Sequence, residues 1–252
     1  MDFHLAEKVA IVTGGSRGLG RAICRALAAE GACVAVNYRR QRAEAVAVVD
    51  EMRQSGGPAM AIAADVSLAA DVVRLFDAVE ADLGPVDILV NNAGVWPKGY
   101  VRDISEEDWD RTMTINLKGP FLTCREAVRR WGAARRGGRI VNIVSPAAFL
   151  GSTTGHAHYA ASKAGLVSFT VSLAREVAEQ GIYVNAVAPG MMPTPMAEEA
   201  LAANLQHYLD RIPLGRIAAL DEVAGVVALL ASDRASYTTG ATLDVSGGML
   251  MR

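Results

Sequence analysis

Short apolar runs alternate with longer amphipathic segments along the chain. The apolar runs predict strands at Val9–Thr13, Cys33–Tyr38, Ala59–Ala63, Ile88–Asn91, Ile140–Val144, Tyr183–Ala188 and Thr242–Val245. Helical periodicity predicts helices at Gly18–Glu30, Ala43–Gln54, Ala69–Asp82, Glu106–Ala134, Tyr159–Glu179 and Leu220–Leu230. Near-continuous apolar strands suit a parallel sheet covered on both faces. We therefore predict an α/β fold: a doubly wound, mostly parallel seven-stranded sheet in a single domain, residues 1–252.

One late segment breaks this alternation. Pro189–Arg216 is punctuated by prolines and only partly helical. Insertions at this edge of a sheet often cover an active site, so we predict a substrate-covering role; packing alone would also explain the segment.

Composition excludes several classes of function. The formal net charge of −2 offers no general affinity for nucleic acid or an anionic membrane. The longest apolar runs are too short to span a bilayer, and the first residues contain no apolar stretch of a secretory signal. Three cysteines without CxxC spacing indicate reduced core thiols in a cytoplasmic protein, and four scattered histidines give no reason to expect a metal.

The sequence TGGSRGLG, Thr13–Gly20, lies between the first predicted strand and helix. In that context Gly14 permits a tight turn, Gly18 lets the backbone approach a pyrophosphate, and Gly20 allows close packing of helix on strand. Free N–H groups of the first helical turn would then face the phosphates. The spacing is GxxxGxG rather than GxGxxG, so a purely structural turn is the alternative.

The end of the second predicted strand bears on cofactor choice. An NAD-selective enzyme places an acid about 20 residues past the glycine loop. Here Asn37 occupies that position and is followed by Tyr38 and Arg39. Arg17 and Arg39 could both pair with a 2′-phosphate, which favours NADP over NAD. The alternative is that both arginines are solvated surface charges.

Tyr159 and Lys163 are four residues apart and share one face of a predicted helix. A neighbouring ammonium would lower the pKa of the phenol, so that it exchanges a proton near neutral pH. Ser145 ends a predicted strand, at the edge where doubly wound sheets bind ligands. Asn116 lies within a predicted helix and needs a hydrogen-bond partner, such as a bound water.

Taken together, these motifs resemble the short-chain dehydrogenase/reductase family. The matching features are TGGSRGLG, Asp65–Val66, NNAG at 91–94, the four residues Asn116, Ser145, Tyr159 and Lys163, and PGMMPT. The resemblance implies that Tyr159 is the general acid in reduction and the base in oxidation. It implies that Lys163 holds the nicotinamide ribose, that Ser145 hydrogen-bonds the substrate carbonyl, and that Asn116 fixes a water in a proton relay.

The same resemblance implies a cofactor cleft and a substrate site. The expected cofactor-binding residues are Gly14, Ser16, Arg17, Gly18, Leu19, Gly20, Asn37, Tyr38, Arg39, Asp65, Val66, Asn91, Ala93, Gly94, Ile143, Tyr159, Lys163, Pro189, Gly190, Met192 and Thr194. The expected substrate-binding residues are Trp96, Pro146 and Met191. His156 and His158 lie in the expected Ser145–Tyr159 loop, either as plain polar residues or as substrate or subunit contacts.

Within that family the sequence looks nearest to the 3-oxoacyl carrier-protein reductases, through GATLDVSGGMLM and RIVNIVS. Arg135 and Arg136 lie where a carrier protein would dock, but Gln180 replaces a second basic position. The resemblance implies an NADPH-dependent reductase of a ketone or acyl thioester, assembled as a homotetramer. The alternatives are NAD-dependent oxidation of a small secondary alcohol or sugar, and a non-catalytic dinucleotide-binding protein.

Overall fold

A single parallel sheet organises the molecule. The computed structural model describes residues 3–152 and 154–251. The strands are β1 (Val9–Val12), β2 (Cys33–Tyr38), β3 (Ala59–Ala63), β4 (Val86–Asn91), β5 (Gly138–Ile143), β6 (Ile182–Pro189) and β7 (Thr242–Val245). They form one seven-stranded sheet in the order β3-β2-β1-β4-β5-β6-β7, and every neighbouring pair is parallel. The predicted doubly wound fold is confirmed.

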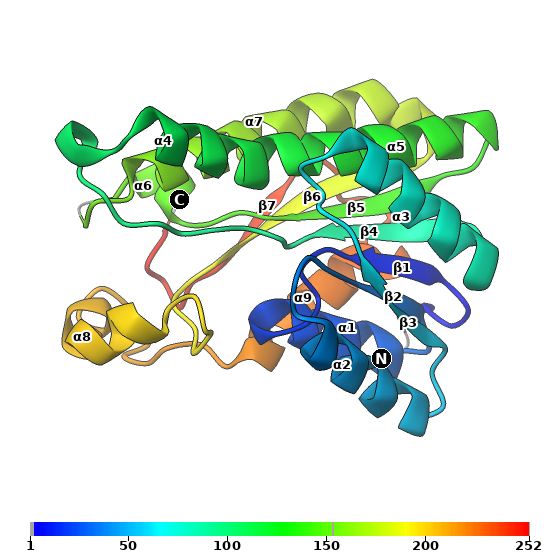
Figure 1. The fold of residues 1–252 in the computed structure, drawn as a ribbon, viewed down its shortest axis with the longest axis horizontal. Helices are drawn as coiled ribbons and strands as arrows, with labels where there is room; N and C mark the ends of the chain where they lie inside the picture. Colours follow the sequence, from blue (N-terminus) through cyan, green and yellow to red (C-terminus); the bar gives the residue numbers. More distant parts are fainter. Residues whose placement is uncertain (1–2, 153, 252) are drawn as a thin grey trace.

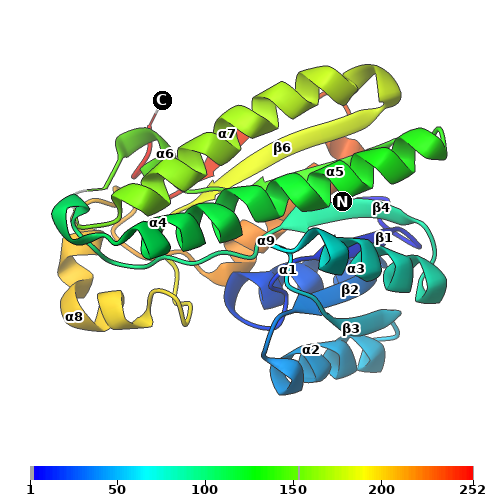
Figure 2. The ribbon, with the colours of Figure 1, turned by 45° about the horizontal axis from the view of Figure 1, so that its top comes forward.

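Helices cover both faces of the sheet (Figures 1 and 2). One layer consists of α1 (Gly18–Ala29), α2 (Arg42–Gln54) and α9 (Leu220–Ala231); the other consists of α3 (Ala69–Asp82), α5 (Gly119–Ala133) and α7 (Ala157–Val177). Each helix layer packs against its face of the sheet and forms a separate hydrophobic core cluster with the strands. Among the described residues, no helix is both long and apolar enough to cross a membrane.

Strands β4 and β5 each begin two residues earlier than the apolar pattern predicts, because polar residues are accommodated within them. Asp87 in β4 accepts a hydrogen bond from the backbone N–H of Val9 at 2.9 Å and forms an ion pair with Arg136. Arg139 in β5 is paired with Asp233 at 2.9 Å. Each charge has an ion-pair partner, so neither residue ends its strand.

The helix predicted from Glu106 to Ala134 is divided. It consists of α4 (Glu106–Met113), a π-helical turn (Thr114–Lys118) and α5. Shorter helical pieces are η1 (Val101–Asp103), α6 (Ala147–Leu150), η3 (Ala178–Gln180) and η4 (Asp233–Ala235). A single π turn inside a helix is frequent at functional sites, and this one contains Asn116.

The segment after β6 contains α8 (Glu198–Leu209), which is interrupted by a non-helical Asn204. In Figures 1 and 2, α8 lies beyond the sheet, on the side away from β2 and β3. The segment is partly helical, as predicted. Cys24 and Cys124 are buried, whereas Cys33 is partly exposed; all three thiols are free. The prediction of core thiols therefore holds for two of the three.

Candidate active site

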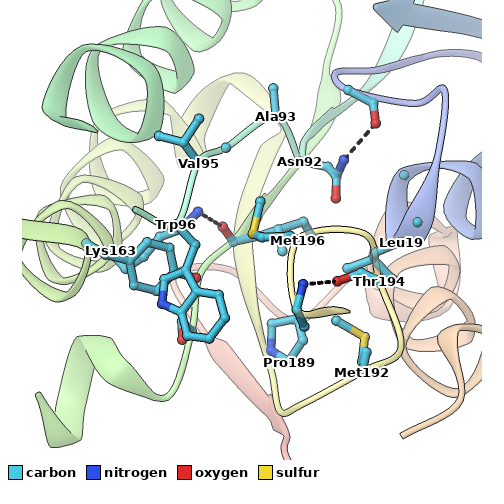
Figure 3. A pocket seen from close by; sticks show the side chains of 18 of the residues that line it. Leu19, Asn92, Ala93, Val95, Trp96, Lys163, Pro189, Met192, Thr194 and Met196 are labelled. Atoms are coloured by element: carbon cyan, nitrogen blue, oxygen red, sulfur yellow. Dashed lines mark hydrogen bonds between the residues drawn. The ribbon is translucent and has the colours of Figure 1, made fainter. Parts of the chain in front are cut away.

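A cavity of about 410 Å³ runs along the carboxyl ends of the strands. It includes residues that follow β1, β4, β5 and β6, and so begins where the strand order reverses between β1 and β4. Ligands of doubly wound sheets bind at this position. Figure 3 shows Leu19 and Asn92 toward one end of the cavity, and Trp96 and Lys163 toward the other.

The glycine loop forms the first end of the cavity. Gly14 and Gly18 have φ values of 63° and 53°, a left-handed conformation that favours glycine. A Cβ on Gly20 would lie 2.2 Å from the carbonyl oxygen of Gly14, so only glycine permits this approach of α1 to the turn. The side chain of Asn92 holds the turn in place by donating to the carbonyls of Thr13 and Gly14, at 3.0 and 3.1 Å. This turn, which has no side chain at Gly14, Gly18 or Gly20 and precedes the N-terminus of α1, forms a cradle suited in chemistry to the pyrophosphate of a dinucleotide.

At the end of β2, a buried asparagine has a structural role, whereas the nearby arginines of the cavity wall are exposed. Asn37 is buried, and its amide group accepts from Gly14 N–H at 3.4 Å and donates to the Ala64 carbonyl at 3.1 Å. Arg17 and Arg39 are exposed and line the cavity. Arg39 lies 3.6 Å from Asp65, and this charge and hydrogen bonds from Ser67 hold the pKa of Asp65 below its usual value despite partial burial.

Ser145, Tyr159 and Lys163 converge at the other end. Ser145 follows β5, and its hydroxyl is hydrogen-bonded to Tyr159, which lies in the first turn of α7. Lys163 lies one turn further along and is buried. Its Nζ donates to the Ile143 carbonyl at 2.7 Å and is 5.8 Å from the centre of the Tyr159 ring.

These environments correct the expected pKa of the tyrosine. Burial raises the pKa of Tyr159, and the hydrogen bond with Ser145 only partly opposes that rise. The expected net lowering does not occur: the ammonium of Lys163 is 5.8 Å from the ring centre and is directed to the Ile143 carbonyl, so its charge does not outweigh burial. Burial lowers the pKa of Lys163 from 10.5 to about 8.

Asn116 has the partners that its position requires. It is fully buried in the π-helical turn. Its amide accepts from Val95 N–H at 2.8 Å and donates to the Val95 carbonyl at 2.9 Å and to the Ser162 hydroxyl at 3.1 Å. Asn116 therefore fixes the strand-to-loop segment beside the cavity and ties it to the helix of Tyr159 and Lys163.

The structure brings nearly all the expected site residues to one cavity wall. Every expected catalytic, cofactor-binding and substrate-binding residue lines it except Asn91 and Asn116. The side chain of Asn91 is instead buried, where it donates to Asn142 at 2.9 Å and accepts from Thr123 at 2.6 Å. Sequence reasoning did not name the other lining residues: Gln41, Ala64, Ser67, Asn92, Val95, Ile115, Val144, Ala147, Leu150, Gly151, Ser152, Thr154, Pro195, Met196, Ala197, Tyr208, Arg211 and Met249.

An aromatic group borders the catalytic end. The ring of Trp96 stacks on His156 at 4.4 Å between centroids and meets Tyr159 edge-on at 6.3 Å. The Nδ1 of His156 donates a hydrogen bond to the Pro97 carbonyl at 2.8 Å. His158 is not a loop residue, because α7 begins at Ala157; it is buried, and burial lowers its pKa.

Comparison with known proteins agrees with this geometry. A family model described as Enoyl-(Acyl carrier protein) reductase matches residues 14–250. A 3-oxoacyl-[acyl-carrier-protein] reductase of Synechocystis sp. is 43% identical over 248 residues, which cover 98% of each chain. A short-chain type dehydrogenase/reductase from Mycobacterium marinum superposes with a TM-score of 0.95 at 34% identity, covering 100% of this chain and 98% of the other.

A dehydrogenase/reductase from Sinorhizobium meliloti superposes with a TM-score of 0.92 at 39% identity, covering 99% of this chain and 98% of the other. The similarity thus extends over the whole chain, and includes both the glycine loop and the catalytic end of the cavity. The chain is an oxidoreductase and belongs to the short-chain dehydrogenase/reductase family.

Proposed function

We propose that this protein reduces the carbonyl group of a 3-oxoacyl thioester or a related ketone with NADPH. The observation that carries the proposal is one continuous cavity with a glycine cradle at one end and Ser145, Tyr159 and Lys163 at the other. The 3-oxoacyl reductase among the similar proteins supports the substrate class. When bound, the nicotinamide cofactor supplies the hydride.

Tyr159 supplies the proton in this proposal. Its raised pKa keeps the phenol protonated near neutral pH, as a general acid must be before it donates. The Ser145 hydroxyl, already hydrogen-bonded to Tyr159, orients the substrate oxygen beside that proton. Once the proton leaves, the nearby positive charge of Lys163 stabilises the phenolate.

Lys163 also restores the proton. Because burial brings its pKa to about 8, the ammonium releases a proton at much lower pH than an exposed lysine would. Asn116 acts by position: it holds Val95 and Ser162, the residue before Lys163. Asn116 is a positioning residue in this scheme, since its side chain does not line the cavity.

Tyr159→Phe tests the chemistry. Removal of the hydroxyl should lower kcat by roughly 10²- to 10⁴-fold, the usual contribution of acid–base catalysis, while NADPH still binds. The assay follows NADPH oxidation with a 3-oxoacyl thioester, and cofactor fluorescence reports binding. Wild-type turnover in this variant would refute the mechanism.

The choice of NADPH rests on Arg17 and Arg39, the exposed cations at the adenosine end of the cavity. Arg17→Gln and Arg39→Gln should each raise the KM for NADPH more than that for NADH. Arg40→Gln is the matched control, because Arg40 is an exposed neighbour that does not line the cavity. A wild-type preference for NADH would contradict this part of the proposal.

A homotetramer working in the cytoplasm completes the proposal. Phe121 on α5 is 40% exposed and meets Phe169 on α7 edge-on, so the outer faces of these helices offer apolar surface to a second copy. The free thiols suit a reducing compartment. Sedimentation at micromolar concentration tests the assembly; a monomer would refute it.

Docking of a carrier protein has weaker support at the predicted arginines. Arg136 is already paired with Asp87, which leaves Arg135 as the exposed cation of the two. We therefore propose the thioester itself, rather than a carrier-protein surface, as the feature that the site recognises.

A further inference from the structure

The charges that line the cavity are unevenly distributed. Arg17, Arg39 and Asp65 belong to the glycine loop, the turn after β2 and the loop after β3, which form the cofactor end. Lys163 belongs to the catalytic group. Among the described lining residues, Arg211 is the remaining formal charge, and it follows α8 on the opposite side of the molecule from β2 and β3 (Figures 1 and 2).

Arg211 has no ion pair or side-chain hydrogen bond with any other residue that the structure describes, in contrast to the exposed and paired Arg21, Arg102 and Arg216. Its neighbour Asp210 accepts a hydrogen bond from Gln206 at 2.6 Å instead. The guanidinium is therefore available to a molecule in the cavity.

The backbone at Arg211 is well anchored. The Arg211 N–H donates to the Tyr208 carbonyl at 3.1 Å, and the next residue, Ile212, is buried. A Cβ on Gly247 would lie 2.8 Å from Ile212, which shows how closely this turn packs on the segment after β7. The Leu214 N–H donates to the Gly247 carbonyl at 3.1 Å. The position of the cation is thus set by the fold, while its side chain keeps the freedom to meet a ligand.

Outside the glycine loop and the segments after β2 and β3, the lining of the cavity is mostly apolar. It includes Trp96, Leu150, Met191, Met196, Tyr208 and Met249, with Ser152, Thr154 and His156 among the polar members. Methionine side chains adapt to flexible apolar groups. An apolar wall with a single unpaired guanidinium is suited to a molecule with an apolar body and one negatively charged end.

We infer that the substrate carries an anionic group, a carboxylate or a phosphate, that pairs with Arg211 while its carbonyl lies at Tyr159. This inference rests on the proposed reductase function and names its substrate class more closely. Two sources share the required chemistry: the carboxylate of a short keto acid, and the phosphate of a phosphopantetheine thioester.

Two pairs of substrates that differ in charge separate these sources. Acetoacetate is compared with methyl acetoacetate, and acetoacetyl-phosphopantetheine with acetoacetyl-pantetheine. The wild-type enzyme should prefer the charged member of one pair by roughly tenfold in kcat/KM, the effect of about one charge-assisted hydrogen bond. Arg211→Gln should abolish that preference through KM and leave the neutral member within about twofold, whereas Arg211→Lys should retain part of it.

Arg216→Gln is the matched control. It removes a cation from the same segment, but Arg216 is paired with Glu222 and does not line the cavity. It should behave as wild type. No charge preference in either pair would overturn the inference, as would an equal loss for charged and neutral members in Arg211→Gln. A weakened affinity for NADPH alone in that variant would assign Arg211 to the cofactor and also overturn it.

The design keeps the two proposals distinguishable. Turnover of a neutral substrate by the wild-type enzyme supports reductase activity whatever Arg211 does. If no ketone is turned over, the proposed function fails, and calorimetry still decides the inference. Both members of each substrate pair are then titrated into the complex of the enzyme with oxidised cofactor. Tighter binding of a charged member, lost in Arg211→Gln, supports the inference, and equal binding of both members refutes it.

Discussion

Gly20→Ala tests whether the close packing of α1 against the glycine turn is needed for stability and for cofactor binding. The added Cβ would lie 2.2 Å from the carbonyl oxygen of Gly14 and 2.6 Å from Nδ2 of Asn92. Those two atoms are hydrogen-bonded to each other at 3.1 Å, so neither moves away freely. The Cβ is about 1.2 Å closer to the carbonyl than the 3.4 Å at which ordinary contact begins, so α1 and the turn must separate by about that distance.

Two opposing effects set the loss of stability. Alanine is more favourable than glycine inside a helix by about 1 kcal/mol, whereas overpacking costs about 1–3 kcal/mol. Because the overlap of about 1.2 Å is large, we take the upper part of the overpacking range, about 2–3 kcal/mol. After the helix preference of alanine is subtracted, the free energy of unfolding should fall by roughly 1–2 kcal/mol, which corresponds to a Tm lower by about 2–8 °C for a chain of this size. A shift of about 1 Å in the cradle should also raise the Kd for NADPH by roughly 10- to 100-fold.

Calorimetry measures the first effect and cofactor fluorescence the second. Gly225→Ala is the control, because Gly225 lies in α9 and a Cβ there meets no atom within 4 Å. The control should raise Tm by about 2–4 °C and leave the Kd unchanged. Wild-type values of both Tm and Kd in Gly20→Ala would refute the steric argument; a lower Tm with unchanged Kd would show that the loop does not hold the cofactor.

Three further predictions concern stability. Burial keeps the pKa of His158 below its ordinary 6.5, so the unfolded chain takes up a proton first and Tm should fall as pH drops below about 6.5. Calorimetry at pH 5.5 and 7.5 should show a smaller fall in Tm for His158→Phe than for the wild type. An equal fall in both proteins would disprove the assignment. Arg130 pairs with three carboxylates on α3 and α5, so Arg130→Met should cost roughly 1–2 kcal/mol at low ionic strength in urea titrations and less in about 1 M salt, where charges are screened. A loss that does not depend on salt would argue against an electrostatic origin. A Cβ at Gly138 would lie 2.4 Å from the ring of Trp131, which is held in place because its Nε1 donates to the Val86 carbonyl at 2.6 Å. Gly138→Ala should therefore lower the free energy of unfolding by about 1–3 kcal/mol in a urea titration. An unchanged urea midpoint would contradict this prediction.

The sheet could be predicted from the sequence because its strands are continuous apolar runs, but their first residues could not. Asp87 and Arg139 look like strand breakers in one dimension. Their partners, Val9 and Arg136 for the first and Asp233 for the second, lie far away in the chain. Burial of a charge within a strand depends on such partners, and a local pattern does not contain them.

The two asparagines of NNAG show the same limit within the site. The motif placed the pair correctly at the end of β4, yet it indicated Asn91 as the cofactor residue. Successive side chains of a strand point to opposite faces. Asn91 therefore enters the layer beneath α5, where it meets Asn142 and Thr123, while Asn92 faces the glycine turn. Which of two identical neighbours faces the cavity depends on strand register, which the motif does not specify.

Residues of the substrate end were missed for a different reason. Tyr208 and Arg211 lie in Pro189–Arg216, the segment predicted to cover the substrate, but neither they nor Met249 belong to a motif that would single them out. They reach the cavity because the segment after β6 folds back against the segment after β7. Proton chemistry was misjudged at Tyr159 because helical spacing gives the distance between two side chains but not the direction of the ammonium. The hydrogen bond of Lys163 to Ile143 sets that direction.

One hydrogen-bonded frame connects the two ends of the cavity. The hydroxyl of Thr13 accepts from the backbone N–H groups of Asn92 and Ala93, at 2.9 and 3.0 Å, and the Asn92 side chain returns two bonds to the glycine turn. Three residues further along, Val95 is held by Asn116, which is bonded in turn to Ser162, the neighbour of Lys163. The cradle and Tyr159 are thus attached to the same short segment after β4. The proposed hydride transfer requires reacting atoms within about 3–3.5 Å, so in that mechanism a segment fixed at both ends would let a bound cofactor and Tyr159 meet the same carbonyl.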